Sequence, residues 1–317
     1  MILSKGHQIE YLLDYKSGKI KKGLGIDCPF DENLRFKPKQ LCIILGHDNV
    51  GKTYWINWYF LSLSLKHDLK WVIWSGENQS GQIVRDLIQM LSGRPFKELL
   101  NDEIVRYSNK IDYWFTFIDN SILYKPEQLL KLFAESDADG CLIDPYTGLD
   151  RAMSWEENYR FLNMTRQFCN STGKTVYINT HPTTDSGRQG NIYPEKHHWH
   201  GHLRPPLKDH VEGGKSFLNR CDDMIVIHRL IKHESMRFIT LVNVEKIKDM
   251  DTGGKHTMID NPILFEYNNG LGFTNDGVDP IKAYRDKSNK NITFDKPPII
   301  DNDDFSSYTY HKTELPF

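Results

Sequence analysis

Short apolar runs alternate with amphipathic segments along most of the chain. Runs bounded by Gly, Asp, Asn or Ser are typical of buried strands, and they occupy residues 41–45, 71–74, 113–118, 140–143, 175–178 and 224–227. Helical spacing of apolar residues lies between most of them, at 53–65, 81–91, 126–135 and 155–170. Because strands that alternate with helices form parallel sheets, the pattern predicts an α/β fold with a mainly parallel, twisted sheet and helices on both faces.

The pattern changes after Arg229. Residues 237–244 and 262–267 alternate over longer stretches, which predicts antiparallel strands at one edge of the sheet. Residues 276–317 are rich in Asp, Asn, Lys and Pro without a sustained apolar period, so we expect a flexible acidic-aromatic tail. The expected organisation is a linker segment at 1–22, one large domain at 23–275 and the tail at 276–317.

Composition removes several classes of protein. The 317 residues carry a formal net charge of -2, so bulk charge gives no sign of a nucleic-acid partner. No apolar stretch reaches the ~20 residues that cross a bilayer, and the first residues lack a secretory signal pattern. The five cysteines include no Cys-x-x-Cys pair, which argues against a disulfide framework or a zinc module. We expect a cytoplasmic protein with no membrane partner.

The strongest chemical signal is the segment from Gly46 to Thr53, which reads Gly-His-Asp-Asn-Val-Gly-Lys-Thr. It follows an apolar run and opens an amphipathic segment, which is the context that a phosphate-binding loop requires. Glycines permit a tight loop whose amides point at phosphates, while Lys52 reaches the terminal phosphates and Thr53 offers its hydroxyl to Mg²⁺. We therefore expect ATP and Mg²⁺ as ligands and assign nucleotide binding to Gly46, Asn49, Gly51, Lys52, Thr53 and Tyr54.

Two carboxylates follow other predicted strands. Asp144 ends the run at 140–143 and would join Thr53 in holding Mg²⁺; the alternative is a strand-terminal Asp that begins a turn with Pro145. Glu77 follows the run at 71–74 and is a candidate base for hydrolysis, or else a solvated turn residue. Both would lie at the carboxyl edge of the sheet, where open α/β sheets bind ligands.

The order and spacing of several blocks resemble the RecA-fold hexameric helicases of the DnaB and Twinkle type, including the helicase half of phage primase-helicases. The resembling blocks are residues 25–41, 75–78, 143–149, 158–160, 180–182 and 204–227. The resemblance runs from residue 23 to residue 273. It implies a RecA-like P-loop NTPase fold.

The resemblance also assigns roles. Glu77 takes the place of the family's water-activating base, and His181 that of its polar γ-phosphate sensor. A Lys-x-Arg pair in this family reaches the nucleotide of the neighbouring subunit; Lys246 and Lys248 stand in its place here. Lysine lacks the two-pronged guanidinium, so either this contact is weaker or a nearby residue such as Arg229 shares the task. The alternative is that both lysines only solvate an exposed strand.

Two loops are candidates for the DNA-binding surface of such a ring, because rings hold single strands by backbone charge and stacking. They span residues 150–155 and 183–208, and their candidate DNA-binding residues are Arg151, Trp155, Arg188, Lys196, Trp199, Arg204 and Lys208. The histidine-rich run 196–202 permits a zinc interpretation, but no cysteine or carboxylate cluster is adjacent. We favour a polar-aromatic loop that becomes ordered on DNA.

The sequence thus predicts a ring-shaped replicative DNA helicase driven by ATP, a hexamer with nucleotide between subunits and, by resemblance alone, 5′-to-3′ polarity. A bacterial or phage-infected cell is the expected setting. Residues 2–15 have helical spacing and are expected to pack on the adjacent subunit, and the tail is expected to bind a DNA polymerase or primase. Two alternatives stay open: a RecA-like ATPase of the recombinase or loader type that binds DNA without unwinding it, and a nucleotide-gated assembly module.

Overall fold

Nine strands form one sheet in the order β3-β2-β4-β5-β1-β6-β7-β8-β9 within the residues that the computed structural model describes, which are 2, 4–20, 22–152, 154–187, 191–258 and 260–290. The strands are β1 Leu41–Leu45, β2 Trp71–Ser75, β3 Phe115–Phe117, β4 Gly140–Asp144, β5 Thr175–Thr180, β6 Asp223–Arg229, β7 Ile239–Lys246, β8 Ile263–Tyr267 and β9 Phe273–Asn275. The first six are parallel, and β7, β8 and β9 are antiparallel additions at one edge. The α/β fold and the antiparallel edge expected from the sequence are confirmed.

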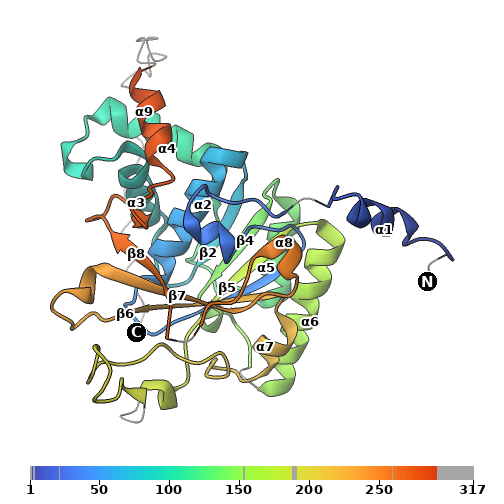
Figure 1. Ribbon diagram of the computed structural model, residues 1–317. Coiled ribbons are helices and arrows are strands. Elements are labelled where there is room, and N and C mark those ends of the chain that lie inside the picture. The colour runs from blue at the N-terminus through green and yellow to red at the C-terminus, as the bar shows by residue number, and fades with distance from the viewer. Residues whose placement is uncertain are drawn as a thin grey trace, which may run out of the picture.

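Helices cover both faces of the sheet (Figure 1). They are α1 Ile9–Lys16, α2 Lys52–His67, α3 Ser80–Ser92, α4 Asn101–Trp114, α5 Pro126–Glu135, α6 Trp155–Thr172, α7 Ser216–Arg220, α8 Met250–Gly253 and α9 Lys282–Lys290, with short 3-10 helices at Pro29–Glu32, Phe96–Glu98, Tyr146–Gly148, Thr184–Gly187 and Met236–Phe238. Helices α2, α3 and α4 pack on one face, and α5, α6 and α7 on the other. None of these helices is long and apolar enough to span a membrane within the described residues.

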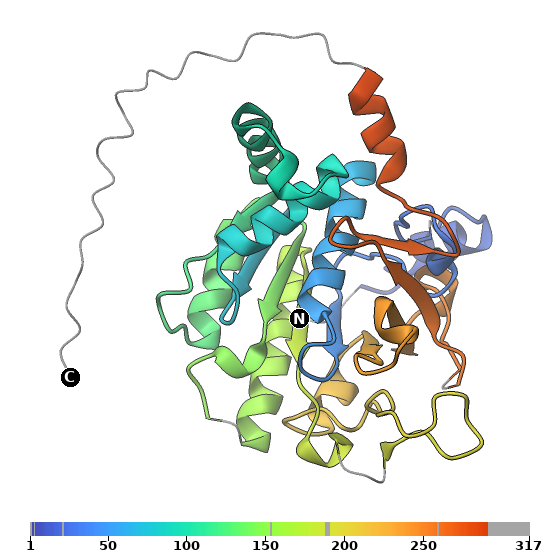
Figure 2. The ribbon, with the colours of Figure 1, turned by 90° about the vertical axis from the view of Figure 1, so that its left-hand side faces the viewer.

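Helix α2 runs through the centre of its layer, which explains its many aromatic residues. Trp55 and Trp58 are fully buried against Phe265 of β8, with ring centroids 5.5 Å apart in each pair. The β8–β9 hairpin therefore closes over α2, as Figure 2 shows beside the central helix. This packing fixes the helix whose first turn carries Lys52 and Thr53.

One predicted strand was wrong in part. The apolar run at 113–118 was expected to be a strand, but α4 continues to Trp114 and β3 begins only at Phe115. Tyr107, Ile111 and Trp114 form a buried stripe at helical spacing, and the Trp114 indole donates a hydrogen bond to Asp68 (2.8 Å). The helical stripe therefore extends into the apolar run and shortens the strand.

The two ends of the chain differ from each other. Helix α1 has no buried residue and projects from the body in Figure 1. The tail boundary expected at 276 is too early, because Ile281 is fully buried and Arg285 of α9 pairs with Asp279 (2.6 Å) and donates to the Leu271 carbonyl. Residues 291–317, the rest of the expected tail, lie outside the described residues.

Candidate nucleotide-binding site

The carboxyl ends of the four strands β1, β2, β4 and β5 meet around one cleft of about 950 Å³. Each strand end contributes polar groups to its lining: Asp48 to Thr53 after β1, Glu77 after β2, Asp144 at the end of β4, and His181 after β5. Parallel pairing places these ends at one edge, so residues far apart in sequence become neighbours. The sheet brings together the phosphate loop, Asp144, Glu77 and His181.

The loop after β1 has the geometry of a phosphate cradle. Gly51 adopts a left-handed conformation (φ 88°) as it enters α2, and a Cβ on Gly46 would collide with the Ile227 carbonyl oxygen. Lys52 folds back on this loop, where its ammonium donates to the carbonyl oxygens of Gly46 (2.7 Å) and His47 (3.0 Å). Burial lowers the pKa of Lys52, and these carbonyls hold its charge at the mouth of the cradle.

The Thr53 hydroxyl donates to the Asp144 carboxylate, with 2.8 Å between Oγ1 and Oδ2. Asp144 is buried, and two further donors orient it: the Asn179 amide on Oδ1 (2.6 Å) and the Ser75 hydroxyl on Oδ2 (3.3 Å). A hydroxyl and a carboxylate held this close are hard oxygen ligands of the kind that Mg²⁺ accepts. The residues present therefore fit the metal expected from the sequence.

His181 lies between two carboxylates. Its Nδ1 is 2.7 Å from Asp48 Oδ1 in the phosphate loop, and its Nε2 is 3.7 Å from Glu77 Oε1. The Lys52 ammonium is 3.5 Å from the same Nδ1. Both carboxylates are largely exposed to the cleft, whereas the imidazole is mostly covered. The arrangement provides a proton acceptor, Glu77, beside a hydrogen-bonding ring that spans the mouth of the phosphate cradle.

Tyr54, the last residue assigned to nucleotide binding, lines the cleft but is tied to the hairpin. Its hydroxyl accepts a hydrogen bond from the Gly272 amide (3.1 Å), and its ring packs edge-on against Tyr267 and Phe273. Tyr54 thus connects α2 to the β8–β9 hairpin and forms one wall of the cleft.

Sequence reasoning missed Asp48, Ser75 and Asn179. Asn179 and Ser75 are polar residues near the ends of otherwise apolar buried strands, and that break in pattern was the available signal. Asp48 occupies a position of the loop that tolerates many residue types, so nothing local marked its pairing with a histidine from the end of β5.

Comparison with known proteins places this site in context. No family model matches the chain. A Twinkle homolog protein of Arabidopsis thaliana, described as chloroplastic/mitochondrial, is 24% identical over 217 residues, which cover 61% of this chain. The chain matches only 28% of that protein's length.

Two solved structures share the architecture. One, described as an ATPase domain, superposes with a TM-score of 0.65 and 13% identity, covering 86% of this chain and 99% of that one. A DnaB-like replicative helicase, described together with its interactions with primase, superposes with a TM-score of 0.67 and 11% identity over 86% of this chain and 68% of its own. The chain has the fold of a DnaB-type helicase ATPase domain. The RecA-like fold and the resemblance to DnaB- and Twinkle-type helicases are confirmed.

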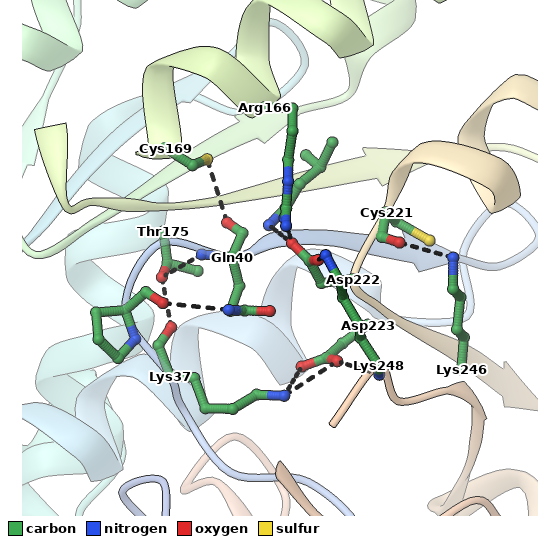
Figure 3. A network of polar contacts seen from close by, with 12 residues as sticks. Lys37, Gln40, Arg166, Cys169, Thr175, Cys221, Asp222, Asp223, Lys246 and Lys248 are labelled. Carbon is green, nitrogen blue, oxygen red and sulfur yellow. Dashed lines mark hydrogen bonds and ion pairs between the residues drawn. The ribbon is translucent and has the colours of Figure 1, made fainter. Parts of the chain in front are cut away.

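In this fold, the two lysines proposed to reach a neighbouring nucleotide lie at the opposite, amino-terminal edge of the parallel strands. Figure 3 shows both lysines near Asp222, Asp223 and Cys221. Lys246 donates to the carbonyls of Leu218 (2.6 Å) and Cys221 (2.7 Å) at the end of α7. Lys248 is 58% exposed and pairs with Asp222 (2.9 Å). Lys246 is therefore engaged within its own chain, and Lys248 is the more available of the two cations.

Arg229 does not stand near Lys248. It ends β6 at the phosphate-loop edge, where its guanidinium lies 3.7 Å from the position of a Cβ on Gly51, and it donates to the Arg237 carbonyl (2.6 Å). The suggestion that Arg229 shares the task of the missing arginine is thus not supported by this position, because the length of β6 separates Arg229 from Lys248, whose amide bonds to Asp223 at the start of that strand.

The first candidate DNA loop presents one aromatic side chain. Trp155, at the start of α6, is 58% exposed and stacks on Tyr159 with ring centroids 5.2 Å apart. Arg151 instead turns inward, donates to Asn158 (2.5 Å) and lies over the Tyr146 ring. Trp155 is thus available for stacking, whereas Arg151 braces the loop.

The second candidate loop buries its tryptophan. Trp199 lies in a small apolar cluster with Tyr193, Leu230 and Leu241, where it is not available as the expected stacking residue. A buried indole has no free face for a base. Lys196 and Lys208 are exposed, Arg204 is half-buried near Asp260, and Arg188 lies outside the described residues.

The histidine-rich run 196–202 contains stacked rings. His197 stacks on Tyr193 (4.3 Å between centroids) and on His198 (4.3 Å). The described residues contain no group of three or more His, Cys, Asp or Glu side chains placed to hold a metal ion.

Proposed function

We propose that the chain is an ATP-hydrolysing motor that assembles into a hexameric ring, translocates 5′-to-3′ on single-stranded DNA and unwinds duplex DNA during replication. The observation that carries this proposal is the grouping in one cleft of Lys52, the hydrogen-bonded pair of Thr53 and Asp144, and the separate carboxylate of Glu77. A protein that only binds nucleotide needs the first three residues. Hydrolysis additionally needs a carboxylate outside the metal-binding pair, and Glu77 is one.

Lys52 would leave the Gly46 and His47 carbonyls and bind the terminal phosphates of ATP, since its charge is held at the entrance of the cradle. Thr53 and Asp144 would hold Mg²⁺, which when bound neutralises phosphate charge. Asn179 and Ser75 keep the Asp144 carboxylate in place for that task.

Glu77 would accept a proton from the attacking water as the oxygen bonds to the γ-phosphorus and the bond to the leaving ADP oxygen breaks. His181 would contact the γ-phosphate through the ring nitrogen that faces Glu77, while Asp48 contacts the other ring nitrogen and orients the ring. His181 contacts both Asp48 of the phosphate loop and the base Glu77. Loss of the γ-phosphate would therefore alter the surroundings of both residues.

The neighbouring subunit would complete the site. Lys248, exposed at the far edge of the sheet, is the residue that we expect to approach the neighbour's nucleotide. Lys246 stays a prediction for the same role, with its ammonium engaged at α7 in the isolated chain. Helix α1 exposes Ile9, Leu12 and Leu13, and packing on an adjacent copy would bury this face.

DNA would be held by charge and stacking in the ring channel. Trp155 supplies an exposed aromatic face, while Lys196, Lys208 and Arg204 supply cations for phosphates. Arg188 remains a sequence-based candidate. A primase or DNA polymerase is proposed as the partner of residues 300–317; deleting them should weaken that binding and spare ATPase activity, and unchanged partner affinity would refute this contact.

The buried state of Trp199 favours one alternative function, an ATPase that binds DNA without unwinding it, because one expected stacking residue is removed from the channel. A forked duplex with a 5′ single-stranded arm distinguishes the two. Helicase activity requires ATP-dependent strand separation, whereas the alternative requires DNA-stimulated hydrolysis alone. The expected controls are loss of turnover in Lys52→Ala and retained nucleotide binding with little turnover in Glu77→Gln. Normal turnover in Glu77→Gln would refute the base assignment.

A further inference from the structure

One cluster at the amino-terminal edge of the sheet holds more cations than carboxylates. Figure 3 shows the cations Lys37, Arg166, Lys246 and Lys248 gathered around two adjacent carboxylates, Asp222 and Asp223. Asp222 and Asp223 are almost fully buried, as is Lys37. With four cations and two anions, the cluster retains net positive charge, which stabilises an anion brought from outside.

The two carboxylates are occupied on several sides. Asp222 accepts a hydrogen bond from the Leu41 amide (2.8 Å) and pairs with both Arg166 and Lys248. Asp223 pairs with Lys37 (3.2 Å) and accepts from the Lys248 amide (3.2 Å). One carboxylate thus holds the Arg166 guanidinium and the Lys248 ammonium side by side, and its neighbour fixes the backbone of Lys248.

The four cations divide into two kinds. Lys37 and Lys246 are committed to groups of their own chain, a buried carboxylate and the end of α7. Arg166 keeps 23% of its side chain exposed and Lys248 keeps 58%. A guanidinium has five N–H donors, so one carboxylate leaves part of the Arg166 fork unused.

We propose that Arg166 on α6 supplies the guanidinium that the Lys248 position lacks, and that the two side chains together contact the terminal phosphate of a nucleoside triphosphate bound to the neighbouring copy. The inference rests on the proposed function, because it requires a nucleotide site between subunits. A planar fork binds two phosphate oxygens at once, which an ammonium does not do. Asp222 acts as the positioning residue, since it aligns the two cations.

Other arginines do not meet these conditions. Arg229 lies beside its own phosphate loop at the opposite edge of the sheet. Arg220 contacts the Tyr159 hydroxyl and lies over its ring. Arg160, on the same helix as Arg166, is 68% exposed and lies 3.8 Å from Glu127 and from Glu157, so its ion pairs are with these two acidic partners.

A mixing experiment on the full chain tests this assignment. Lys52→Ala removes the phosphate-loop side of a site and Arg166→Ala removes the neighbour's side, so each variant alone should lose turnover by at least about a hundredfold. Mixed one to one, some interfaces pair an intact loop with an intact Arg166, and DNA-stimulated ATPase activity should recover to about a quarter of the wild-type rate if subunits mix at random and sites work independently. A chain carrying both substitutions, mixed with Lys52→Ala, should stay inactive.

Two further variants separate this role from a structural one. Arg166→Lys keeps the charge next to Asp222, so it should retain the wild-type unfolding midpoint in urea yet remain at least about tenfold slower in turnover. Arg160→Ala, on the same helix, should keep wild-type turnover. Assembly driven by a non-hydrolysable ATP analogue, measured by sedimentation, should weaken in Arg166→Ala.

Three outcomes would overturn the inference. If the wild-type chain hydrolyses ATP and Arg166→Ala does so equally fast, the proposed function survives and the role of Arg166 fails. Absence of recovery in the mixed rings, with Arg166→Lys fully active, would show a structural role only. If the wild-type chain neither hydrolyses ATP nor assembles with nucleotide, the proposed function fails, and the inference about Arg166 fails with it.

Discussion

His181 and Asp48 are in polar contact across the mouth of the phosphate cradle, with 2.7 Å between Nδ1 and Oδ1. An acid in this loop opposes phosphate binding, because its charge lies close to the groups that bind the terminal phosphates. The same carboxylate orients the imidazole whose other nitrogen faces Glu77. The Asp48 carboxylate therefore weakens phosphate binding but orients the His181 ring. Substitutions at Asp48 can separate these two effects.

Asp48→Asn and Asp48→Ala should affect different kinetic constants. The amide keeps an oxygen for the His181 ring but removes the charge, so KM for ATP should fall by about fivefold while kcat stays near the wild-type value. Alanine removes the acceptor as well, so kcat should fall by about tenfold. Steady-state ATPase assays measure both constants. Asp102→Asn, an exposed acid on α4, is the matched control, and an unchanged kcat in Asp48→Ala would contradict the orienting role.

Asn179→Ala should weaken Mg²⁺ binding. The Asn179 amide holds the Asp144 oxygen that is not bonded to Thr53, and loss of such an outer contact lowers metal affinity by about tenfold. The ratio of ADP affinities with and without Mg²⁺, from calorimetric titration, measures this directly. Thr180→Val is the matched control, because its hydroxyl donates to the Ile44 carbonyl and does not touch Asp144. An equal ratio in wild type and Asn179→Ala would rule out the contribution.

Local sequence pattern was sufficient for the sheet and the phosphate loop. The strand Leu41–Leu45, the loop with Lys52 and the carboxylate of Asp144 each depend on residues close in sequence, so periodicity and motif spacing predict them. Trp114 shows the limit of this reasoning. By pattern alone it fits both an apolar strand and the buried stripe of a helix, and only its contact with the distant Asp68 shows that it belongs to the helix.

Contacts between distant segments could not be predicted. Trp199 is buried by Leu230 and Leu241, which belong to the β6–β7 region, and a local pattern cannot show that these strands reach the loop. The pairing of Asp48 with His181 and the position of Arg166 beside Lys248 likewise arise only when separate elements meet. Sequence alone therefore located the chemistry of the loop better than the cations at the far edge.

Trp155→Ala should weaken single-stranded DNA binding, since the indole is exposed and stacks on Tyr159 at the edge of a candidate channel loop. Base stacking on such a ring contributes about 1–3 kcal/mol, so affinity should fall by roughly tenfold or more. Fluorescence anisotropy with an oligothymidine measures the change. Trp199→Ala provides the contrast: it should lower the unfolding free energy by about 3 kcal/mol, because it leaves a cavity, while the DNA affinity of the folded protein changes little. If Trp199→Ala lowered DNA affinity more than Trp155→Ala, Trp199 and not Trp155 would be the residue that stacks on DNA.

Stability should fall as the pH drops below about 6.5, and His228 should account for much of the loss. Its Nε2 donates to the Leu203 carbonyl (2.8 Å), and burial lowers the pKa of His228 to about 4. Between pH 6.5 and 4 the unfolded chain binds a proton that the folded chain excludes, so acid favours unfolding, by about 2 kcal/mol at pH 5. Burial and the nearby Lys52 also lower the pKa of His47, which shifts stability in the same direction.

Urea unfolding at pH 7.5 and pH 5 gives the difference in unfolding free energy between the two pH values. This difference should shrink by about 2 kcal/mol in His228→Gln and stay unchanged in His7→Gln, an exposed control. An identical pH dependence in wild type and His228→Gln would show that other groups govern the acid response.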